Sequence, residues 1–355
     1  MKRTLVLKVN PYSPESHAIR IAADIIRKGG LAAFPTETVY GLGADALNPE
    51  AVKALFKAKM RPFDNPPIVH VADLRDVYRL AKNIPRKAEK LMKAFWPGPL
   101  TLIFKRSDLV PDVTVTCLET IAIRMPKHNV ALALIRESNC PIAAPSANLA
   151  GKPSPTTAQH VLEDLYGRID IVLDGGPTRI GVESTVLDLT VDPPQILRPG
   201  GTSYETLKKT LGKVELHPVV TAEEELPISK ARSPGMKHRH YAPKAKLILV
   251  EGNLAAIVKK IAELTHYYSR RKAKVGVLAT DETAALHRAD VVKSLGSRNS
   301  LEEIAKNLFR LLRELDAEGV DVIIAEGIPS EGLGLAVINR LRKASGYHIV
   351  KAEEL

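Results

Sequence analysis

Between Lys246 and Ala344, short apolar segments alternate with longer segments whose apolar residues recur at helical spacing. The first pattern is typical of buried strands and the second of amphipathic helices. We expect strands at Lys246–Val250, Val275–Ala279 and Val320–Ala325, and helices at Leu254–Leu264, Glu282–Ala289, Leu301–Leu315 and Leu335–Ala344. Because strands that alternate with helices form parallel sheets covered on both faces, this part is predicted to be a small doubly wound, Rossmann-like α/β domain.

The N-terminal part mixes strands and helices in a less regular order. Apolar residues between positions 18 and 26 predict a helix that Gly29 and Gly30 end, and Asn48 followed by Pro49 predicts the start of another. Further strands are expected at Leu31–Phe34, Ile68–Val71, Leu100–Lys105, Ile121–Arg124, Pro141–Ala144, Ile169–Leu173, Ser184–Leu189 and Gln195–Arg198, and further helices at Pro85–Phe95, Val130–Glu137 and Thr157–Tyr166. This is more strand than a βαβ series provides, so we expect a twisted mixed α/β sheet that is open on one face.

Between these two patterns, residues 213–244 contain scattered prolines, little periodicity and a basic end. The chain of 355 residues is also long for a single core. We therefore predict an N-terminal domain at 1–212, a linker at 213–244 and a C-terminal domain at 245–355.

Composition limits the class of protein. No apolar run approaches the ~20 residues that span a bilayer, and the basic N-terminus lacks the apolar core of a signal peptide, so we expect no membrane association and a cytoplasmic location. Two cysteines, Cys117 and Cys140, are too few for a disulfide framework or a metal cluster. A formal net charge of +11 suggests an anionic partner and leaves nucleotide and RNA both open.

The segment Phe34–His70 combines a hydroxyl- and glycine-rich loop, a short helix and the cations Lys59 and Arg61, which Pro62, Pro66 and Pro67 follow. Hydroxyls, bare backbone and cations held by a stiff chain are suited to binding a polyanion. Gly41 and Gly43 match the letters of a dinucleotide fingerprint, but they do not directly follow a strand and no helix begins there. We interpret them as room for the chain to turn beside a substrate.

Polar residues also follow buried strands elsewhere. Arg124 closes an apolar strand, and Ser146 and Asn148 follow another, where α/β proteins place ligands. Ser184 lacks the flanking glycines of a nucleophile elbow and is interpreted as a hydrogen-bond donor. His238 and His240 have the spacing of a weak metal pair, but no acidic or sulfur ligand lies near them, so we expect no side-chain metal site.

Several motifs occur in one order along the chain: FPTETVYGLG, Lys59-Met60-Arg61, PPIVH ending in His70, FWPGPLT, IAIRMPKH around Arg124, APSAN, RPG from Arg198 and GMKHRHYAP. Together they resemble the threonylcarbamoyl-AMP synthases of the Sua5/YrdC/YwlC group, in the long two-domain Sua5 form. The resemblance implies a YrdC-like catalytic domain at 1–212, a lid over the active site at 213–244 and the Sua5 C-terminal domain at 245–355.

That resemblance implies a nucleotidyltransferase. It would condense L-threonine, bicarbonate (or CO2) and ATP with Mg2+ into L-threonylcarbamoyl-adenylate and diphosphate, the first step toward N6-threonylcarbamoyladenosine at position 37 of tRNA. The product would pass to a tRNA threonylcarbamoyl-transferase complex of the Kae1/TsaD type. A direct tRNA contact, the role of the C-terminal domain and the oligomeric state remain open.

The same motifs imply roles for individual residues. Thr38, His70, Arg124, Ala144 and Ser184 fall on the threonine side. Lys59, Arg61, Asn65, Thr120, Ser146, Asn148, Ser154, Arg198 and the lid residue Tyr241 fall on the ATP side, and Lys59, Arg61, Ser146 and Asn148 would be catalytic. Mg2+ would bind through the ATP phosphates. No strong general base stands out, so catalysis is expected to rest on positioning and electrostatic preorganisation.

Two other functions compete with this one. A YrdC-like domain could be a non-catalytic module that binds double-stranded RNA or tRNA, although aromatic residues make up only 5% of the chain. The same domain occurs in carbamoyltransferases that form carbamoyl-adenylate, but those proteins carry cysteine-rich segments that two cysteines cannot supply.

Overall fold

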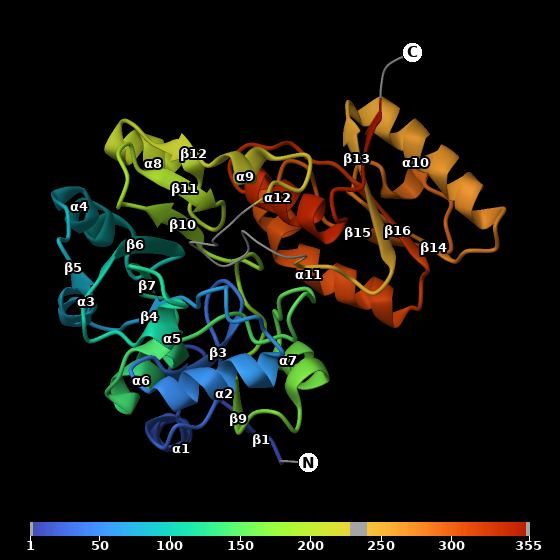
Figure 1. Ribbon diagram of the computed structural model, residues 1–355. Helices are drawn as coiled ribbons and strands as arrows, with labels where there is room; N and C mark the ends of the chain where they lie inside the picture. Colours follow the sequence, from blue (N-terminus) through green and yellow to red (C-terminus); the bar gives the residue numbers. More distant parts are fainter. Residues whose placement is uncertain (1–2, 228–239, 353–355) are drawn as a thin grey trace. The chain divides into compact units, whose positions relative to one another are not determined.

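The structure, a computed structural model, describes residues 3–227 and 240–352. These residues form two compact units (Figure 1). We call residues 3–150 and 154–220 the first unit, and residues 151–153, 221–227 and 240–352 the second unit. Each unit contains one sheet, and each is described by itself below.

The first unit is a mixed α/β fold, as the sequence predicts. Its elements are β1 (Leu5–Lys8), α1 (Ser16–Arg27), β2 (Ala32–Pro35), β3 (Tyr40–Asp45), α2 (Pro49–Lys59), β4 (Val69–His70), α3 (Leu74–Leu80), β5 (Ala81–Lys82), α4 (Arg86–Phe95), β6 (Leu100–Arg106), α5 (Asp112–Val115), β7 (Thr120–Arg124), α6 (Asn129–Ser138), β8 (Ile142–Ala143), α7 (Ala158–Leu165), β9 (Ile171–Asp174), β10 (Thr185–Asp188), β11 (Gln195–Arg198), α8 (Tyr204–Leu211), β12 (Glu215–Leu216) and α9 (Pro218–Thr221). Twelve strands form one sheet in the order β1-β9-β2-β3-β8-β4-β7-β6-β10-β11-β12, with β5 paired to β6.

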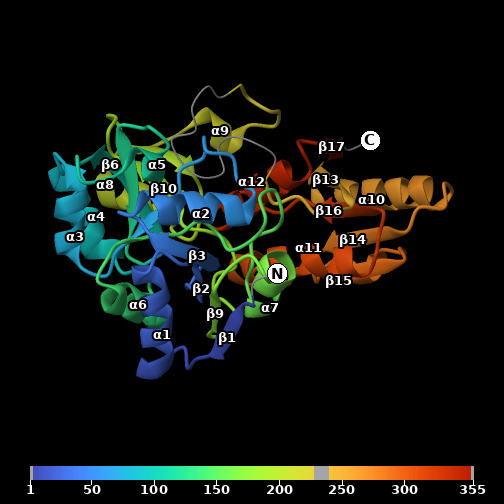
Figure 2. The ribbon, with the colours of Figure 1, turned by 60° about the horizontal axis from the view of Figure 1, so that its bottom comes forward.

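The core of the first unit lies between this sheet and two helices. Helices α1 and α6 lie side by side (Figures 1 and 2). Ile26 of α1 and Leu134 of α6 are fully buried and belong to one apolar cluster with Phe34 of β2 and Ile171 of β9. Because this face of the sheet is filled by apolar side chains, polar groups collect at the strand ends and in the loops that follow them.

Strand β3 occupies residues that the sequence suggested were a glycine-rich turn. A Cβ on Gly43 would lie 2.8 Å from both the Phe34 ring and the side chain of Ile142. Gly41 and Gly43 both belong to β3, an extended strand that pairs with β2. The expected turn is therefore wrong: Gly43 makes room for Phe34 in the core, which is a demand from a neighbouring strand that local sequence does not show.

Helix α2 begins and ends as its residues predict. The side chain of Asn48 accepts hydrogen bonds from the backbone N–H groups of Glu50 and Ala51, and Pro49 occupies the first helical position. The helix ends at Lys59, where Met60 adopts a left-handed conformation with φ 52°. This turn fixes the path of the chain between the two cations Lys59 and Arg61.

Part of the expected linker is ordered within the first unit. Strand β12 pairs in parallel with β11, and α9 follows it. The two units divide near residue 220. Residues 228–239 of the predicted lid, which include His238 and Arg239, lie outside the described residues. The closure of the lid over the site stays a prediction.

The second unit contains β13 (Lys246–Gly252), α10 (Leu254–Ser269), β14 (Val275–Ala279), the 3-10 helix η1 (Ala284–Leu286), β15 (Val291–Ser294), α11 (Leu301–Ala317), β16 (Val322–Glu326), α12 (Gly334–Ala344) and β17 (Ile349–Ala352). The strands form one parallel sheet in the order β15-β14-β16-β13-β17. Ile248 and Val250 pack with Ile257 and Ile261 of α10, while α12 contacts β13 and packs against α11 (Figure 1). The predicted parallel α/β fold is confirmed.

One predicted helix of the second unit is wrong. Residues 282–289 form only the short turn η1, and β15 follows as an additional edge strand paired with β14. The pairing of β15 with β14 outweighs the helical spacing of the alanines and the leucine in residues 282–289.

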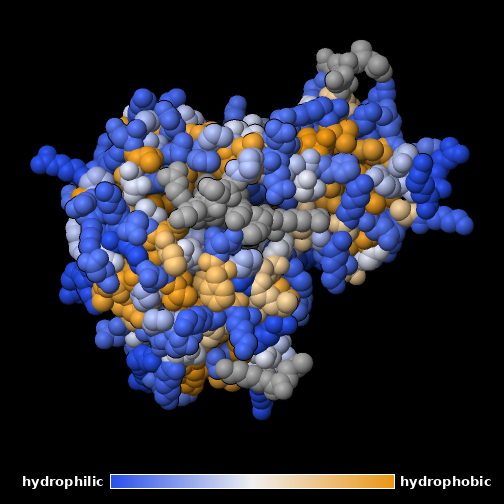
Figure 3. Space-filling model, viewed as in Figure 1, coloured by the Kyte–Doolittle hydropathy of each residue, from blue (hydrophilic) through white to orange (hydrophobic). Residues whose placement is uncertain are grey.

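The surface of each unit is mostly hydrophilic in the view of Figure 3, with apolar residues in separate patches. None of the helices in the described part of the chain has the length and apolar character that a bilayer crossing requires.

Candidate active site

The strand pairing brings two of the predicted threonine-side residues together. Strands β4 and β7 are parallel neighbours, and His70 is the register partner of Arg124. Both residues are the last of their strands, and both side chains are buried. Because the carboxyl ends of parallel strands meet at the same edge, the two side chains face one region of the sheet.

Three groups hold the guanidinium of Arg124. Its Nε donates to the carbonyl oxygen of Gly98 at 3.2 Å, and its Nη1 donates to Oγ1 of Thr38 at 3.0 Å. Its Nη2 lies 2.7 Å from Oε2 of Glu37, in an ion pair whose two side chains are almost fully buried. The guanidinium is therefore fixed before any ligand arrives, and two of the three contacts come from the loop after β2.

That loop is itself rigid. Oγ1 of Thr36 donates to the carbonyl oxygen of Val39 at 2.7 Å and accepts from the backbone N–H of Thr38 at 3.1 Å. The backbone N–H of Ile180 also donates to the carbonyl oxygen of Glu37 at 2.8 Å. The Thr36 hydroxyl and the backbone of this loop are thus held in place by hydrogen bonds.

His70 is a neutral imidazole. Burial, together with the nearby cation Arg124, lowers the pKa of His70 to about 3. Its Nδ1 lies 3.2 Å from the carbonyl oxygen of Ile68, which can only accept, so we assign the proton to Nδ1. This leaves Nε2 as an acceptor for a hydroxyl group. The backbone N–H of Ala144 donates to the same carbonyl at 2.8 Å, which places Ala144 beside His70.

Ser184 joins the two predicted sides of the site. Its Oγ lies 2.8 Å from Oγ1 of Thr101. Arg198, which we predicted for ATP, donates from Nη2 to the carbonyl oxygen of Ser184 at 3.0 Å and to its Oγ at 3.2 Å. Residues predicted for threonine and for ATP therefore share direct contacts at the start of β10.

A glycine allows this close approach. A Cβ on Gly200 would lie 2.2 Å from the carbonyl oxygen of Glu183 and 2.4 Å from the carbonyl carbon of Ser184. No side chain fits there. Gly200 therefore holds the backbone after Arg198 against the start of β10.

Lys59 ties α2 to the loop after β8. It is almost fully buried, and its Nζ donates to the carbonyl oxygen of Asn148 at 2.5 Å and to that of Ser146. Burial, and secondly the cation Arg61, lowers the pKa of Lys59 well below its usual value. An approaching anion would favour the charged form of Lys59. A bound phosphate group is therefore expected to raise the pKa of Lys59.

Ser146 and Asn148 are clamped between Lys59 and β3. The backbone of Ser146 bridges to Gly41, and the N–H of Ala147 donates to the carbonyl oxygen of Tyr40 at 2.8 Å. Arg61 is held separately, since its Nε donates to the carbonyl oxygen of Asn65 at 3.0 Å. Of the four predicted catalytic residues, Lys59 ends α2 and Arg61 follows it, and the contacts of Lys59 bring both against the loop that contains Ser146 and Asn148.

Three further predicted residues lie differently. Oγ of Ser154 donates to Oε1 of Glu183 at 2.5 Å, next to Ser184 in sequence. Thr120 is the first residue of β7 and Arg124 the last, so the two lie roughly 13 Å apart along the strand. Only an elongated ligand could reach both. Tyr241 belongs to the second unit, where its ring stacks on Phe309 at 5.4 Å between centroids; its contact with ATP stays a prediction.

Sequence reasoning missed Glu37, which contacts Arg124 directly. A signal was present, because Glu37 is an acidic residue in a segment that otherwise contains apolar residues, hydroxyls and glycines. A carboxylate in such a segment is buried only when it has a partner or a function. Thr101 gave no comparable signal, since it lies within an apolar strand as an ordinary β-branched residue.

Comparison with known proteins gives the family. Residues 24–200 match the Sua5/yciO/yrdC family, described as telomere recombination, and residues 202–346 match the family described as threonylcarbamoyl-AMP synthase, C-terminal domain. The chain is 55% identical to the threonylcarbamoyl-AMP synthase of Pyrococcus abyssi, over 95% of this chain and 96% of that protein. It is 50% identical to the synthase of Bacillus subtilis, over 99% of each.

A solved structure is equally similar. The crystal structure of P. abyssi Sua5 complexed with L-threonine superimposes with a TM-score of 0.94 at 53% sequence identity, over 99% of this chain and 100% of that chain. The family matches of both halves of the sequence and the similarity of the fold indicate the same family. This chain belongs to the threonylcarbamoyl-AMP synthase family, in its two-domain Sua5 form.

Proposed function

We propose that this chain condenses L-threonine, bicarbonate and ATP into L-threonylcarbamoyl-adenylate, diphosphate and water. The observation that carries the proposal is the fixed guanidinium of Arg124 beside the neutral imidazole of His70. A fixed guanidinium suits a carboxylate, and a buried neutral acceptor suits a hydroxyl. The relative crystallised with L-threonine supports the choice of amino acid.

On the threonine side, Arg124 binds the substrate carboxylate through N–H groups not used by Gly98 and Thr38. Nε2 of His70 accepts from the threonine hydroxyl. Because burial has already removed water from these groups, their orientation costs little when the substrate arrives. Ala144 and Ser184 border the same region through their contacts with Ile68 and Thr101.

On the nucleotide side, the carbamate oxygen of the carboxylated threonine attacks the α-phosphorus, and diphosphate leaves. This is an adenylyl transfer, so we place the enzyme among the nucleotidyltransferases. Lys59, Arg61 and Arg198 neutralise the charge that develops on the phosphate oxygens, while Ser146 and Asn148 orient them. Asn65, Ser154, Thr120 and Tyr241 are assigned to the remainder of the nucleotide.

We infer that Mg2+ arrives as MgATP. Among the described residues, no three His, Cys, Asp or Glu side chains come together as the ligands of a metal ion would. Cationic and hydroxyl groups instead suit the phosphates that carry the ion. When bound, Mg2+ would neutralise phosphate charge during departure of diphosphate.

The product is a reactive mixed anhydride of a carbamic and a phosphoric acid. It therefore requires a second catalyst that accepts the threonylcarbamoyl group before water does. We propose handover to a tRNA threonylcarbamoyl-transferase complex of the Kae1/TsaD type. Whether tRNA contacts this chain directly can be tested by the salt dependence of its binding.

One assay tests the activity. The protein is incubated with MgATP, bicarbonate and L-threonine, and diphosphate and threonylcarbamoyl-adenylate are measured by chromatography and mass spectrometry. We expect diphosphate release to require both threonine and bicarbonate. Release that depends on neither would exclude the synthase, whereas release with carbamoyl phosphate in place of both would identify a carbamoyltransferase.

A further inference from the structure

Glu37 is a buried carboxylate whose hydrogen-bonding capacity is unused. Its side chain is 2% exposed. Oε2 lies 2.7 Å from Nη2 of Arg124, yet among the described residues neither carboxylate oxygen of Glu37 has a hydrogen-bond partner of good geometry. Leaving a buried acceptor unsatisfied is costly, and proteins tolerate it mainly where a ligand completes the site.

The neighbour of this carboxylate is the group assigned to the substrate carboxylate. In an α-amino acid the nitrogen lies only about 2.5 Å from the carboxyl carbon, because a single Cα separates them. Residues that bind the two ends of the zwitterion must therefore be adjacent and opposite in charge. Arg124 and Glu37 are such a pair. Arg124, at the end of β7, donates to the carbonyl oxygen of Gly98, and the carbonyl oxygen of Glu37, in the loop after β2, accepts from the backbone N–H of Ile180.

We propose that Glu37 binds the ammonium group of threonine and accepts the proton that this group must lose before its nitrogen can attack CO2. The proposal rests on the proposed function. The ammonium transfers one proton to the Glu37 carboxylate. The freed lone pair then forms the N–C bond as a C=O π pair moves onto oxygen. After water has taken the first proton from Glu37, the carboxylate accepts the second proton from the nitrogen. With CO2, each turnover thus releases two protons from the nitrogen.

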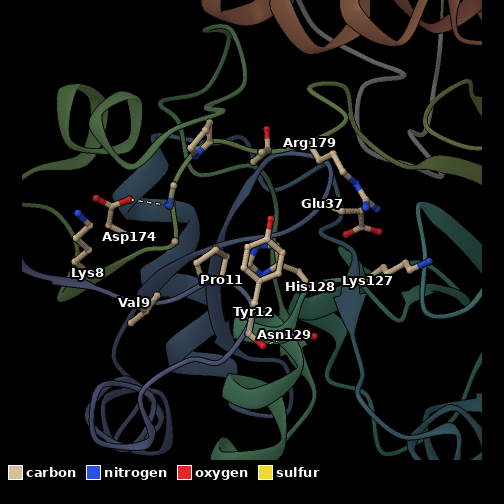
Figure 4. A pocket seen from close by; sticks show the side chains of 14 residues that line it. Lys8, Val9, Pro11, Tyr12, Glu37, Lys127, His128, Asn129, Asp174 and Arg179 are labelled. Atoms are coloured by element: carbon tan, nitrogen blue, oxygen red, sulfur yellow. Dashed lines mark hydrogen bonds between the residues drawn. The ribbon is translucent and has the colours of Figure 1, made fainter.

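These two protons must leave the site, and a cavity beside Glu37 offers them a route. Glu37 also lines a cavity of about 660 Å³ at the carboxyl ends of β1 and β9. Lys127, His128 and Arg179 surround the same cavity (Figure 4). Water in this cavity can take the proton from Glu37.

The competing explanation is that Glu37 only neutralises Arg124. The two explanations differ for a ligand that has a carboxylate and no ammonium. We would measure the dissociation constants of L-threonine and of (2S,3R)-2,3-dihydroxybutanoate, in which a hydroxyl replaces the ammonium, by calorimetry. Wild type should prefer threonine by roughly ten- to hundredfold, the value of a charge-assisted hydrogen bond.

In Glu37→Gln, which keeps the shape of the side chain, this preference should disappear while dihydroxybutanoate binds within about threefold of wild type. Asp174→Asn is the matched control. Asp174 lines the same cavity and accepts from the backbone of Gly176 at 3.0 Å, so its loss should leave the preference unchanged. If Glu37→Gln does not fold, Glu37→Ala, which also removes the carboxylate, gives the same comparison.

An equal loss of affinity for both ligands would overturn the proposal, because it would mean that Glu37 only positions Arg124. So would an unchanged preference for threonine. Both results leave the synthase intact if wild type still makes the adenylate. Failure of the wild-type protein to bind threonine would instead reject the proposed function.

Discussion

His70 and Arg124 are register partners at the carboxyl ends of two parallel strands, and the pKa of the imidazole falls to about 3 through burial and the neighbouring cation. We propose that the two residues divide the recognition of threonine between them. One is a fixed positive charge and the other a neutral acceptor. A hydroxy amino acid carries the matching anion and hydroxyl, and the predictions below test each part of that match.

Replacing His70 by Gln should flatten the decline of stability in acid. The folded imidazole stays neutral down to about pH 3, whereas the unfolded one takes up a proton near its ordinary pKa of about 6.5. Between these values the unfolded state binds more protons, so stability is lost as pH falls from 6.5 toward 3, by up to roughly 1.4 kcal/mol per pH unit. Urea unfolding at about pH 7.5 and about pH 5 measures this. Parallel profiles for both proteins would contradict the assigned protonation.

Lys59→Ala should lower turnover by about 10²-fold or more, as expected for loss of a transition-state donor. It also removes the link between α2 and the carbonyl groups of Ser146 and Asn148. Diphosphate release at saturating substrates is the measurement. Lys57→Ala, on the exposed side of the same helix, is the control and should remain near wild type. Normal turnover in Lys59→Ala would remove this residue from catalysis.

Arg124→Ala should chiefly raise the Michaelis constant for threonine, since the guanidinium is assigned to the substrate carboxylate. Arg124→Lys keeps the charge and loses the planar fork, so it should recover only part of the affinity. Initial rates with threonine and ATP varied in turn separate the two constants. Arg75→Ala, at a side chain that is 88% exposed, serves as the control. An effect confined to ATP would show that the substrate sides are reversed.

Gly200→Ala should destabilise the first unit by ~2–4 kcal/mol, because the new Cβ would overlap the backbone of Glu183 and Ser184. Gly41→Ala is the matched control. Its Cβ would meet Ala144 at 3.4 Å, an ordinary contact, so the cost should stay within about 1 kcal/mol. Denaturant unfolding compares the two variants. Similar losses would mean that the backbone at Gly200 can move away from β10.

Some of the fold follows from local sequence. The strand Gln195–Arg198 and the strand Val275–Ala279 have the bounds that their apolar patterns predict, and Asn48 with Pro49 starts α2 as expected. These signals are local, because side-chain periodicity and capping depend on neighbours a few residues away. The motifs that indicate the family were likewise recognised by their order along the chain.

Other features depend on contacts between distant residues. Strand β3 exists because Phe34 and Ile142 occupy the space beside Gly43, and β15 exists because β14 offers a free edge. Neither demand is visible in the local sequence, so a turn was expected at Gly41 and Gly43, and a helix was expected at Glu282–Ala289 with no strand after it.

The sequence by itself determined the two α/β domains and the family, and it predicted which residues bind threonine and ATP. Tertiary structure alone decided which of them touch: Arg198 meets Ser184, Lys59 meets the loop of Ser146, and Glu37 meets Arg124. Burial and proximity set the charge of a group, as His70 shows. Burial and proximity arise only when strands far apart in the chain pair. The carboxylate of Glu37 beside Arg124 was therefore identified from the fold and not from the sequence.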